Sequence, residues 1–447
     1  MLTPANSLTA KVLKAMSVFT GVQAVNIICA IVRTKFIALW IGPMGVGLFA
    51  IYNSILELLS NASQLNMGQS AVRDIADAPQ SRLRHTATVV RWWALRLGAA
   101  GLLLTILASP LLSIVSFGGT AHWTAFAALS AAVLFLAVRN GEWAILQGAG
   151  HLLALARSTM WGILGGSAIS IAMFYFWGNA SIVPSIIVTA ACGMASALLH
   201  KNIPGIQMPR REKIQSGKSF LRLGGYITFT ALISQAASYI FIIWLNRTGS
   251  TATVGFYQAG YTLVIQYAGI IFSALSMEFF PRVTKVAHRP RMASVVVSHE
   301  MSVVLTVLTP FVVIFILAAD VITRILYTAE FTVILPFITI GICGAVFRAI
   351  SYCMSYVILA RGDGKAFVFA ELADTAIGLT LNIILFSRYG YAGLGMSYLL
   401  WYIIYVCMIW TVYRCRYGMR LSRRALLTAT IAISCTLGIM ALKMWLL

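Results

Sequence analysis

The chain carries little charge and few acidic residues. Only 10% of its 447 residues are charged, and 12 aspartates and glutamates stand against 33 lysines and arginines. A soluble domain has about a quarter of its residues charged, so the composition excludes an ordinary soluble protein. The positive excess does not indicate nucleic-acid binding, because no solvated domain is available to present a basic face.

Several kinds of chemical site are missing as well. No glycine-rich loop with a phosphate-binding lysine is present, which argues against ATP hydrolysis within the chain. The seven cysteines form no CxxC pair, and the six histidines lack the spacing of metal ligands. We therefore expect no cofactor, no metal site and no enzymatic activity.

Long apolar runs dominate what is present. Hydrophobic residues make up 60% of the chain. They form thirteen runs of a length that can cross the hydrocarbon core of a bilayer as a helix. The sequence therefore predicts an all-α polytopic membrane protein with twelve or thirteen transmembrane helices.

A glycine-containing turn that leads into an apolar helix occurs twice, near Gly42 and near Gly255. This self-similarity predicts two repeats of six helices, and the repeats are parallel because an even number of helices precedes the second. A basic stretch with Pro204 and Pro209 lies at the midpoint and is interpreted as the linker. The predicted parts are an N-terminal lobe at 1–200, a linker at 201–221, a C-terminal lobe at 222–415, and a basic turn with an extra helix at 416–447.

The distribution of lysine and arginine predicts the orientation. Most of these residues fall in alternate gaps between the apolar runs, and cytoplasmic loops are the ones that carry such an excess. The opposite set of gaps contains only Arg247, Arg324, Arg388 and Lys443. We expect a cytoplasmic N-terminus and, after thirteen crossings, a periplasmic C-terminus.

Some cations remain inside the apolar runs. An arginine at the centre of a transmembrane helix costs about 2.5 to 3.5 kcal/mol on insertion scales, so it is retained where it faces protein or water. Arg139 and Arg348 lie at matching depths in the two halves, and Arg33 shares a helix face with Asn26. A structural alternative pairs Arg139 with Glu142 at i, i+3, and Lys35 and Arg91 alternatively extend toward the membrane surface.

Polar and aromatic residues accompany these arginines. Such polar stripes must be buried in lipid, so we expect them to line one shared cavity. The polar and aromatic candidates are Asn26, Asn53, Asn61, Trp143 and Tyr352, with Trp401 and Tyr405 as further aromatic residues that either stack on sugars or pack. The acids Glu57, Glu371 and Asp374 are candidates for ion coupling, and the alternative is neutral acids bonded to another helix.

Four short patterns carry a family resemblance: Gly42-Pro43-x-Gly45-x-Gly47, Val254-Gly255-Phe256-Tyr257-Gln258, Ile358-Leu359-Ala360 and Phe369-Ala370-Glu371-Leu372. With the duplicated halves, they resemble Wzx-type flippases of the multidrug, oligosaccharidyl-lipid and polysaccharide exporter superfamily. The resemblance implies two six-helix lobes around a V-shaped cationic cavity in a bacterial inner membrane. It assigns the cavity cations to Arg33, Lys35, Arg139 and Arg348. The thirteenth run departs from the twelve or fourteen helices common in the family.

The same resemblance implies the partners and leaves two alternatives. The implied substrate is an undecaprenyl-pyrophosphate-linked oligosaccharide, such as an O-antigen or enterobacterial common antigen unit, moved by alternating access. Membrane lipids, H⁺ or Na⁺ and other glycan-assembly membrane proteins are further expected partners. One alternative is a cation-coupled multidrug or small-molecule antiporter of the same superfamily. The other is a polytopic glycan polymerase or acyltransferase, which would need a larger external loop than this sequence has.

Overall fold

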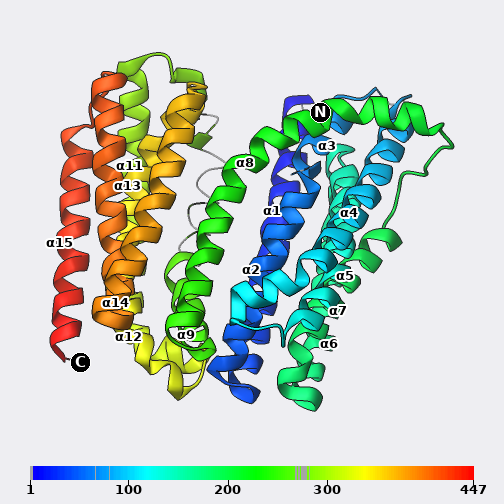
Figure 1. Ribbon diagram of the computed structural model, residues 1–447. Coiled ribbons are helices and arrows are strands. Elements are labelled where there is room, and N and C mark those ends of the chain that lie inside the picture. The colour runs from blue at the N-terminus through cyan, green and yellow to red at the C-terminus, as the bar shows by residue number, and fades with distance from the viewer. Residues whose placement is uncertain are drawn as a thin grey trace. The chain divides into compact units, whose positions relative to one another are not determined.

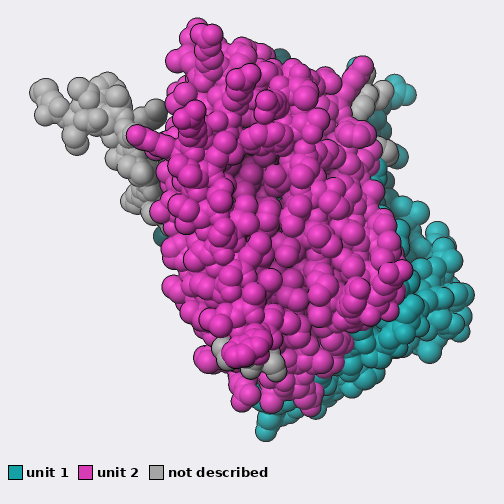
Figure 2. All heavy atoms as spheres, turned by 90° about the vertical axis from the view of Figure 1, so that its left-hand side faces the viewer, with its two compact units in different colours: residues 1–254 teal, residues 255–447 magenta. Residues whose placement is uncertain are grey.

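The computed structural model describes residues 4–446 apart from 66, 80, 267–268, 270–271, 273–278 and 281. Every regular element in these residues is a helix. The chain forms two compact units, residues 1–254 and residues 255–447 (Figure 2). The prediction of an all-α protein is confirmed, and each unit is a helical bundle of its own.

The first unit is built from eight α-helices and a short 3-10 turn (Figure 1). They are α1 (Pro4–Trp40), α2 (Pro43–Gln64), α3 (Met67–Ala76), α4 (Leu83–Phe117), α5 (Trp123–Gly148), α6 (Leu152–Trp177), η1 (Gly178–Ser181), α7 (Ile182–Leu199) and α8 (Arg210–Thr248). The turn from α1 to α2 uses Gly42 at φ 80, which a glycine adopts without strain, and Pro43 at the start of α2.

Helices α4 and α5 pack very closely because small residues face each other. A Cβ added to Gly98 would lie 2.8 Å from the Cβ of Ala137, and one added to Gly141 would lie 2.7 Å from that of Ala94. Small residues at membrane helix interfaces allow this approach. The core beside this contact contains the fully buried Phe126 of α5. The backbone of α5, and with it Arg139, is therefore held firmly in the bundle.

Helix α8 belongs to the first unit, although the sequence places a linker over its start. It begins at Arg210, and it packs against α2, α3 and α4. The indole Nε1 of Trp93 donates to the carbonyl of Lys213 at 3.0 Å, and Ile203 just before the helix is buried. These contacts extend the compact unit to Val254, beyond the predicted boundary. The division into repeats at 1–200 and 222–415 stays a prediction about duplication.

Helix α9 (Thr251–Tyr261) and η2 (Thr262–Gln266) lead into the second unit. The elements that follow are α11 (Pro290–Leu326), η3 (Ala329–Ile334), α12 (Leu335–Gly341), α13 (Gly344–Ala360), α14 (Gly364–Thr411), η4 (Val412–Arg416) and α15 (Arg423–Leu446). The last helix, α15, packs on α11, where Lys443 forms an ion pair with Asp320. The extra C-terminal run of the sequence is thus a helix docked on the second unit.

The 48-residue element α14 is a helical hairpin. Gly390 has φ 58 and ψ −136, a conformation that breaks the helix and that only glycine adopts easily. The arms on either side then lie together, since Ser397 donates to Asn382 and the Nε1 of Trp401 donates to Asp374 at 2.8 Å. Each arm is long enough to cross a membrane at about 1.5 Å per residue.

Among the described residues, eight helices are long and apolar enough to span a membrane, or nine when α12 and α13, bent by 45°, count as one span. Two of the eight, Leu152–Leu199 and Gly364–Arg416, have 48 and 53 residues and contain two packed arms each. The predicted run at 252–280 falls partly outside the described residues. The prediction of a polytopic membrane protein is confirmed, and the number of crossings stays a prediction.

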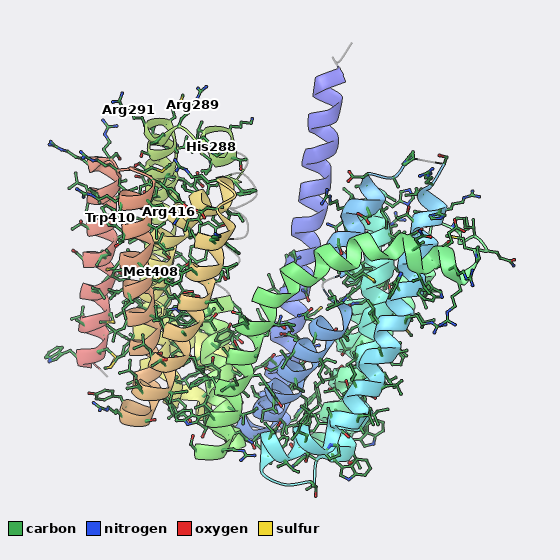
Figure 3. All side chains as sticks on the ribbon, turned by 45° about the horizontal axis from the view of Figure 1, so that its top comes forward. His288, Arg289, Arg291, Met408, Trp410 and Arg416 are labelled. Carbon is green, nitrogen blue, oxygen red and sulfur yellow. The ribbon has the colours of Figure 1, made fainter. Side chains whose placement is uncertain are left out.

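Basic side chains gather at one end of the second unit. His288, Arg289 and Arg291 lie at this end in Figure 3, and Met408, Trp410 and Arg416 follow one another along the returning arm of α14 and η4 toward it. Arg416 forms an ion pair with Asp363 at 2.8 Å. A basic end next to apolar arms is typical of a bundle whose helices end at a membrane surface.

Candidate functional site

Arg139 lies on α5, and its side chain packs against Gly193 of α7. A Cβ added to Gly193 would lie 2.9 Å from the Cδ of Arg139, so glycine is needed to make room for this side chain. The guanidinium lies 4.5 Å from the ring centroid of Trp143, and its Nε and Nη2 donate to Asn140 at 3.3 and 3.1 Å. Arg139 thus keeps its positive charge, held by an amide oxygen and an aromatic ring.

A chain of amides continues from Arg139 into α2. Asn140 donates to the Oε1 of Gln64 at 2.9 Å, and Gln64 donates to the hydroxyl of Ser60. Asn61, on the next position of α2, donates to Gln235 of α8 at 3.1 Å. The amides of α2 thus join an interhelical network, and the cavity role of Asn61 stays a prediction. Asn140 and Gln235 were missed as candidates, although Asn140 directly follows Arg139 in the sequence.

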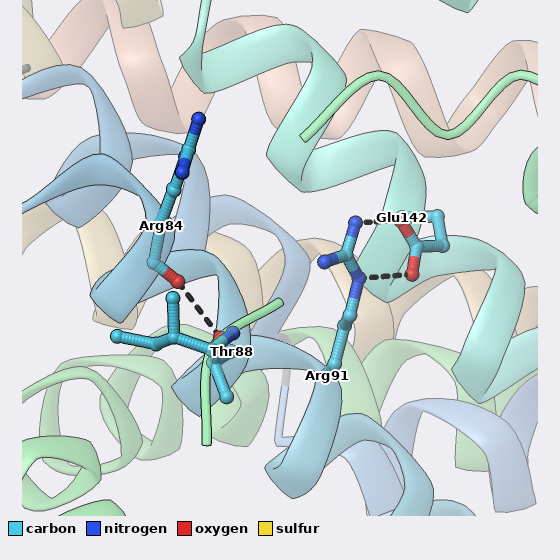
Figure 4. A network of polar contacts seen from close by, with 5 residues as sticks. Arg84, Thr88, Arg91 and Glu142 are labelled. Atoms are coloured by element: carbon cyan, nitrogen blue, oxygen red, sulfur yellow. Dashed lines mark hydrogen bonds and ion pairs between the residues drawn. The ribbon is translucent and has the colours of Figure 1, made fainter. Parts of the chain in front are cut away.

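Glu142 is the partner of Arg91 and not of Arg139. The Nε and Nη2 of Arg91 donate to the two carboxylate oxygens at 2.5 and 2.9 Å, which is a bidentate pair between α4 and α5 (Figure 4). The side chains are only 17% and 4% exposed. The alternatives that pair Arg139 with Glu142 and that extend Arg91 to the membrane surface are both wrong, because the fold brings α4 beside α5. Within the described ranges, no carboxylate forms an ion pair with Arg139.

Arg33 is half-buried on α1. Its guanidinium lies 5.0 Å from the ring centroid of Phe49 on α2, and its buried Nε has no hydrogen-bond partner. A buried guanidinium N–H without an acceptor is costly in a protein interior, so this atom is prepared to donate to a ligand. Lys35, two residues on, is also half-buried.

The remaining polar candidates of the first unit lie on α1 and α2 without meeting Arg139. Asn26 is exposed, and the side chain of Asn53 donates to the carbonyl of Phe49 at 3.0 Å. Glu57 is exposed and, within the described part of the chain, has no ion-pair partner. Asn53 shares a neighbour with Arg33, since both contact Phe49.

Arg348 of α13 lies among aromatic rings in the second unit. Its guanidinium carbon is 5.2 Å from the centroid of Phe272 and 5.7 Å from that of Tyr402. Its Nη1 reaches the carbonyl of Ile265 and the hydroxyl of Tyr398 at 3.5 Å each, at the long limit for a hydrogen bond. The guanidinium is therefore stabilised mainly by ring faces, which leave its N–H groups weakly satisfied.

Tyr352, one turn further along α13, packs against Phe272 in the same region. Its hydroxyl donates to the carbonyl of Phe272 at 2.6 Å, and the two rings lie 5.3 Å apart. Tyr352 is thus a packing partner of Phe272, and Phe272 in turn contacts Arg348. Tyr398 and Tyr402 were missed as candidates, although their i, i+4 spacing next to Trp401 already placed three aromatic rings on one face.

Asp374 and Glu371 come from the first arm of α14. One carboxylate oxygen of Asp374 accepts the hydrogen bond from Trp401, and Glu371 lies one turn earlier and is half-buried. Neither acid forms an ion pair with an arginine in the described part of the chain. Among the ion pairs of the described residues, none involves Arg139 of the first unit or Arg348, Glu371 and Asp374 of the second.

The described residues contain no group of three or more histidine, cysteine or acidic side chains that could hold a metal ion. The described arginines and aromatic rings offer binding by charge and by aromatic faces. The guanidinium groups of Arg33, Arg139 and Arg348 offer N–H donors to an anion such as a phosphate.

The arrangement of helices is that of known transporters. A lipid II flippase, MurJ, in an inward closed conformation superposes with a TM-score of 0.70 at 14% identity, over 95% of this chain and 98% of that one. A multidrug resistance MATE transporter in an inward-facing conformation gives a TM-score of 0.69 at 14% identity, over 88% and 94%. The chain therefore has the fold that the MurJ flippase and the MATE transporter share.

The family follows from the sequence. Residues 36–336 match the profile of the family described as polysaccharide biosynthesis protein, and the chain belongs to this family. A protein of Shigella flexneri named as an O-antigen transporter is 22% identical over 84% of this chain and 91% of its own length. The lipid III flippase of Escherichia coli K12 is 22% identical over 86% and 94%. The predicted resemblance to polysaccharide transporters is confirmed.

Proposed function

We propose that the protein is a flippase that moves an undecaprenyl-pyrophosphate-linked oligosaccharide from the cytoplasmic to the periplasmic leaflet of a bacterial inner membrane. The observation that carries this proposal is that each unit holds a guanidinium, Arg139 or Arg348, that has no ion-paired carboxylate among the residues that the structure describes. Burying such a charge in a membrane bundle is unfavourable unless an anion compensates it, and the diphosphate of the lipid carrier is such an anion.

In the proposed mechanism each unit offers the diphosphate a guanidinium, Arg139 in the first unit and Arg348 in the second, and Arg33 and Lys35 are further cations of the first unit. The oligosaccharide occupies the polar region lined by Asn26, Asn53 and Asn61, and Trp143 and Tyr352 flank the arginines. The lipid tail stays in the bilayer throughout. The two units open alternately to the two sides, with the N-terminus in the cytoplasm and the C-terminus in the periplasm.

We further propose that Glu57, Glu371 and Asp374 couple transport to a proton or sodium gradient. A cation bound at these acids changes the charge around the arginines, and therefore changes the affinity for an anion. The membrane potential adds to the driving force, since it favours the outward movement of a dianion from an inside-negative cell.

A multidrug antiporter is the second candidate, because the solved multidrug transporter superposes nearly as well as the lipid II flippase. Its substrates are cations, which acidic groups attract. The arginines without ion-paired carboxylates favour the anionic substrate instead. The proposal extends to a class of substrate, lipid-linked oligosaccharides, and to a class of partner, the membrane proteins of glycan assembly.

The test is leaflet-specific labelling of lipid-linked glycan in cells that depend on this protein. Arg139→Ala and Arg348→Ala, singly and together, are compared at equal protein levels with Arg388→Ala, which changes an exposed arginine near the break in α14. We expect the double variant to leave the glycan on the cytoplasmic leaflet. Normal export by the double variant would refute the proposal.

A further inference from the structure

Trp401 lies between a carboxylate and the aromatic rings around Arg348. Its Nε1 donates to Asp374 at 2.8 Å across the α14 hairpin. Its ring stacks on Tyr402, with centroids 5.3 Å apart and planes inclined by 19°. Tyr402 in turn faces the guanidinium of Arg348 at 5.7 Å. One continuous set of contacts therefore leads from Asp374 through two rings to Arg348.

The six-membered ring of the indole packs against Gly378 in the facing arm. A Cβ added to Gly378 would lie 2.6 Å from two carbons of the Trp401 ring. Gly378 is one turn from Asp374 on the same arm, so one face of this arm both receives the ring and binds its N–H group. Two contacts with the facing arm, at Asp374 and at Gly378, thus position the ring. One of them is a hydrogen bond to a carboxylate, a group that can bind a cation.

We propose that Trp401 is a positioning residue that transmits cation binding at Asp374 to the anion-binding site at Arg348. This inference rests on the proposed function, and it names the route by which coupling occurs. As a free carboxylate, Asp374 accepts the indole N–H strongly, because hydrogen bonds to ionised acceptors are the stronger ones. A proton or a sodium ion on the carboxylate competes for its lone pairs and weakens that bond.

Without this bond the stacked pair Trp401 and Tyr402 is less restrained. The position of the Tyr402 ring that faces Arg348 therefore changes. The effect is reciprocal, because two ligands that share one equilibrium alter each other's affinity by the same factor. The charged and titratable groups around Asp374 are Glu371 on its own arm, Arg348 of α13, and Tyr398, Tyr402 and Tyr405 of the returning arm.

The competing explanation is direct electrostatic attraction between a cation-free Asp374 and Arg348, which does not involve the indole. Two variants remove the two interactions separately. Trp401→Phe keeps an aromatic ring and both charges but removes the N–H donor. Asp374→Asn keeps an oxygen that accepts this donor but removes the charge.

The experiment measures binding of farnesyl diphosphate, a short prenyl diphosphate, to the full chain in nanodiscs of phosphatidylethanolamine and phosphatidylglycerol. Affinity is compared at high and low pH, and in sodium against potassium. For the wild type we expect a cation-dependent change of about tenfold, within the usual range of coupling between two sites. Trp401→Phe reduces this change to less than about twofold while diphosphate still binds. Trp410→Phe, on the same returning arm, keeps the wild-type response.

Gly378→Ala is the second variant, because it displaces the ring without touching either chemical group. It is expected to reduce the cation response in the same way as Trp401→Phe. A full cation response in both variants would overturn the proposal in favour of direct electrostatics, as would a wild type whose affinity ignores the cation. A wild type that binds no diphosphate at all contradicts the proposed function instead, so the two failures are distinguishable.

Discussion

Neither Arg139 nor Arg348 has an ion-paired carboxylate in the described part of the chain, yet the two units hold them by different means. In the first unit an amide chain binds the guanidinium, with Asn140 at 3.1 Å and Gln64 behind it. In the second unit aromatic rings surround the guanidinium, and its hydrogen bonds are 3.5 Å long. A guanidinium held by ring faces has more unsatisfied donors, so we expect Arg348 to be the stronger of the two toward an anion.

The neighbouring ion pair explains why Arg139 remains available. Glu142, one turn from Arg139, is bound by Nε and Nη2 of Arg91. Glu142→Gln leaves Arg91 with an uncompensated buried charge, and we expect this to lower the free energy of unfolding by about 3 kcal/mol. Thermal unfolding in detergent measures the loss. This is the largest expected effect.

Two controls make that result specific. Asp77→Asn removes an exposed pair with Arg73, whose side chains are 67% and 74% exposed, and should cost less than about 0.5 kcal/mol. Adding Arg91→Met to Glu142→Gln removes the uncompensated charge and should restore most of the stability. If Arg139→Ala restored it instead, Glu142 would belong to Arg139 and the contrast between the units would fail.

The second prediction compares the two arginines in binding. A hydrogen bond to a charged group contributes about 1.5 to 3 kcal/mol, so each replacement by alanine should weaken farnesyl diphosphate binding by roughly tenfold to a hundredfold. Arg348→Ala is expected to lose more than Arg139→Ala, since the donors of Arg348 are less satisfied. Titration of both variants beside Arg388→Ala checks this, and the reverse order would contradict it.

The third prediction concerns the groups that hold each guanidinium. Asn140→Ala breaks the amide chain and should weaken diphosphate binding through Arg139 by about 1 kcal/mol. Tyr398→Phe removes only a 3.5 Å contact to Arg348 and should change affinity by less than about 0.5 kcal/mol. Equal effects of the two variants would show that both arginines are held in the same way.

The smallest expected effect is a dependence on pH at the basic end of the second unit. The backbone N–H of Ala366, followed by Tyr417 and Arg416, lowers the pKa of Asp363, which caps α14. A lowered pKa in the folded state contributes stability above about pH 4, and this contribution is lost as the pH falls through the folded value. Asp363→Asn should flatten the acid side of the stability profile. If the acid side of the stability profile did not change, the Asp363 carboxylate would contribute nothing to stability.

Local patterns in the sequence predicted much of the fold, because they depend on neighbouring residues. The apolar runs at 366–387 and 390–413 match the two arms of α14, and the break falls at Gly390. The buried position of Arg139 followed from its cost inside an apolar run. Trp143 was found because it lies one turn away.

Partners that are distant in the sequence could not be predicted. Arg91 lies 51 residues before Glu142, and only the packing of α4 on α5 brings them together. The acceptor of the Trp401 indole depends on the α14 hairpin in the same way. The boundary between the compact units falls after Val254 and not in the predicted linker at 201–221, because Trp93 of α4 binds the start of α8. Composition alone does not reveal which bundle a helix joins.

The most direct test compares ligands that differ only in their head group. Farnesyl diphosphate, farnesyl monophosphate and farnesol are titrated against the full chain and against the Arg139→Ala/Arg348→Ala double variant in the same nanodiscs. Two guanidinium groups without carboxylate partners predict the order diphosphate, monophosphate, alcohol for the wild type, and no preference for the double variant. Equal affinity for all three ligands, or a double variant that still prefers the diphosphate, would contradict the assignment of an anion-binding arginine to each unit.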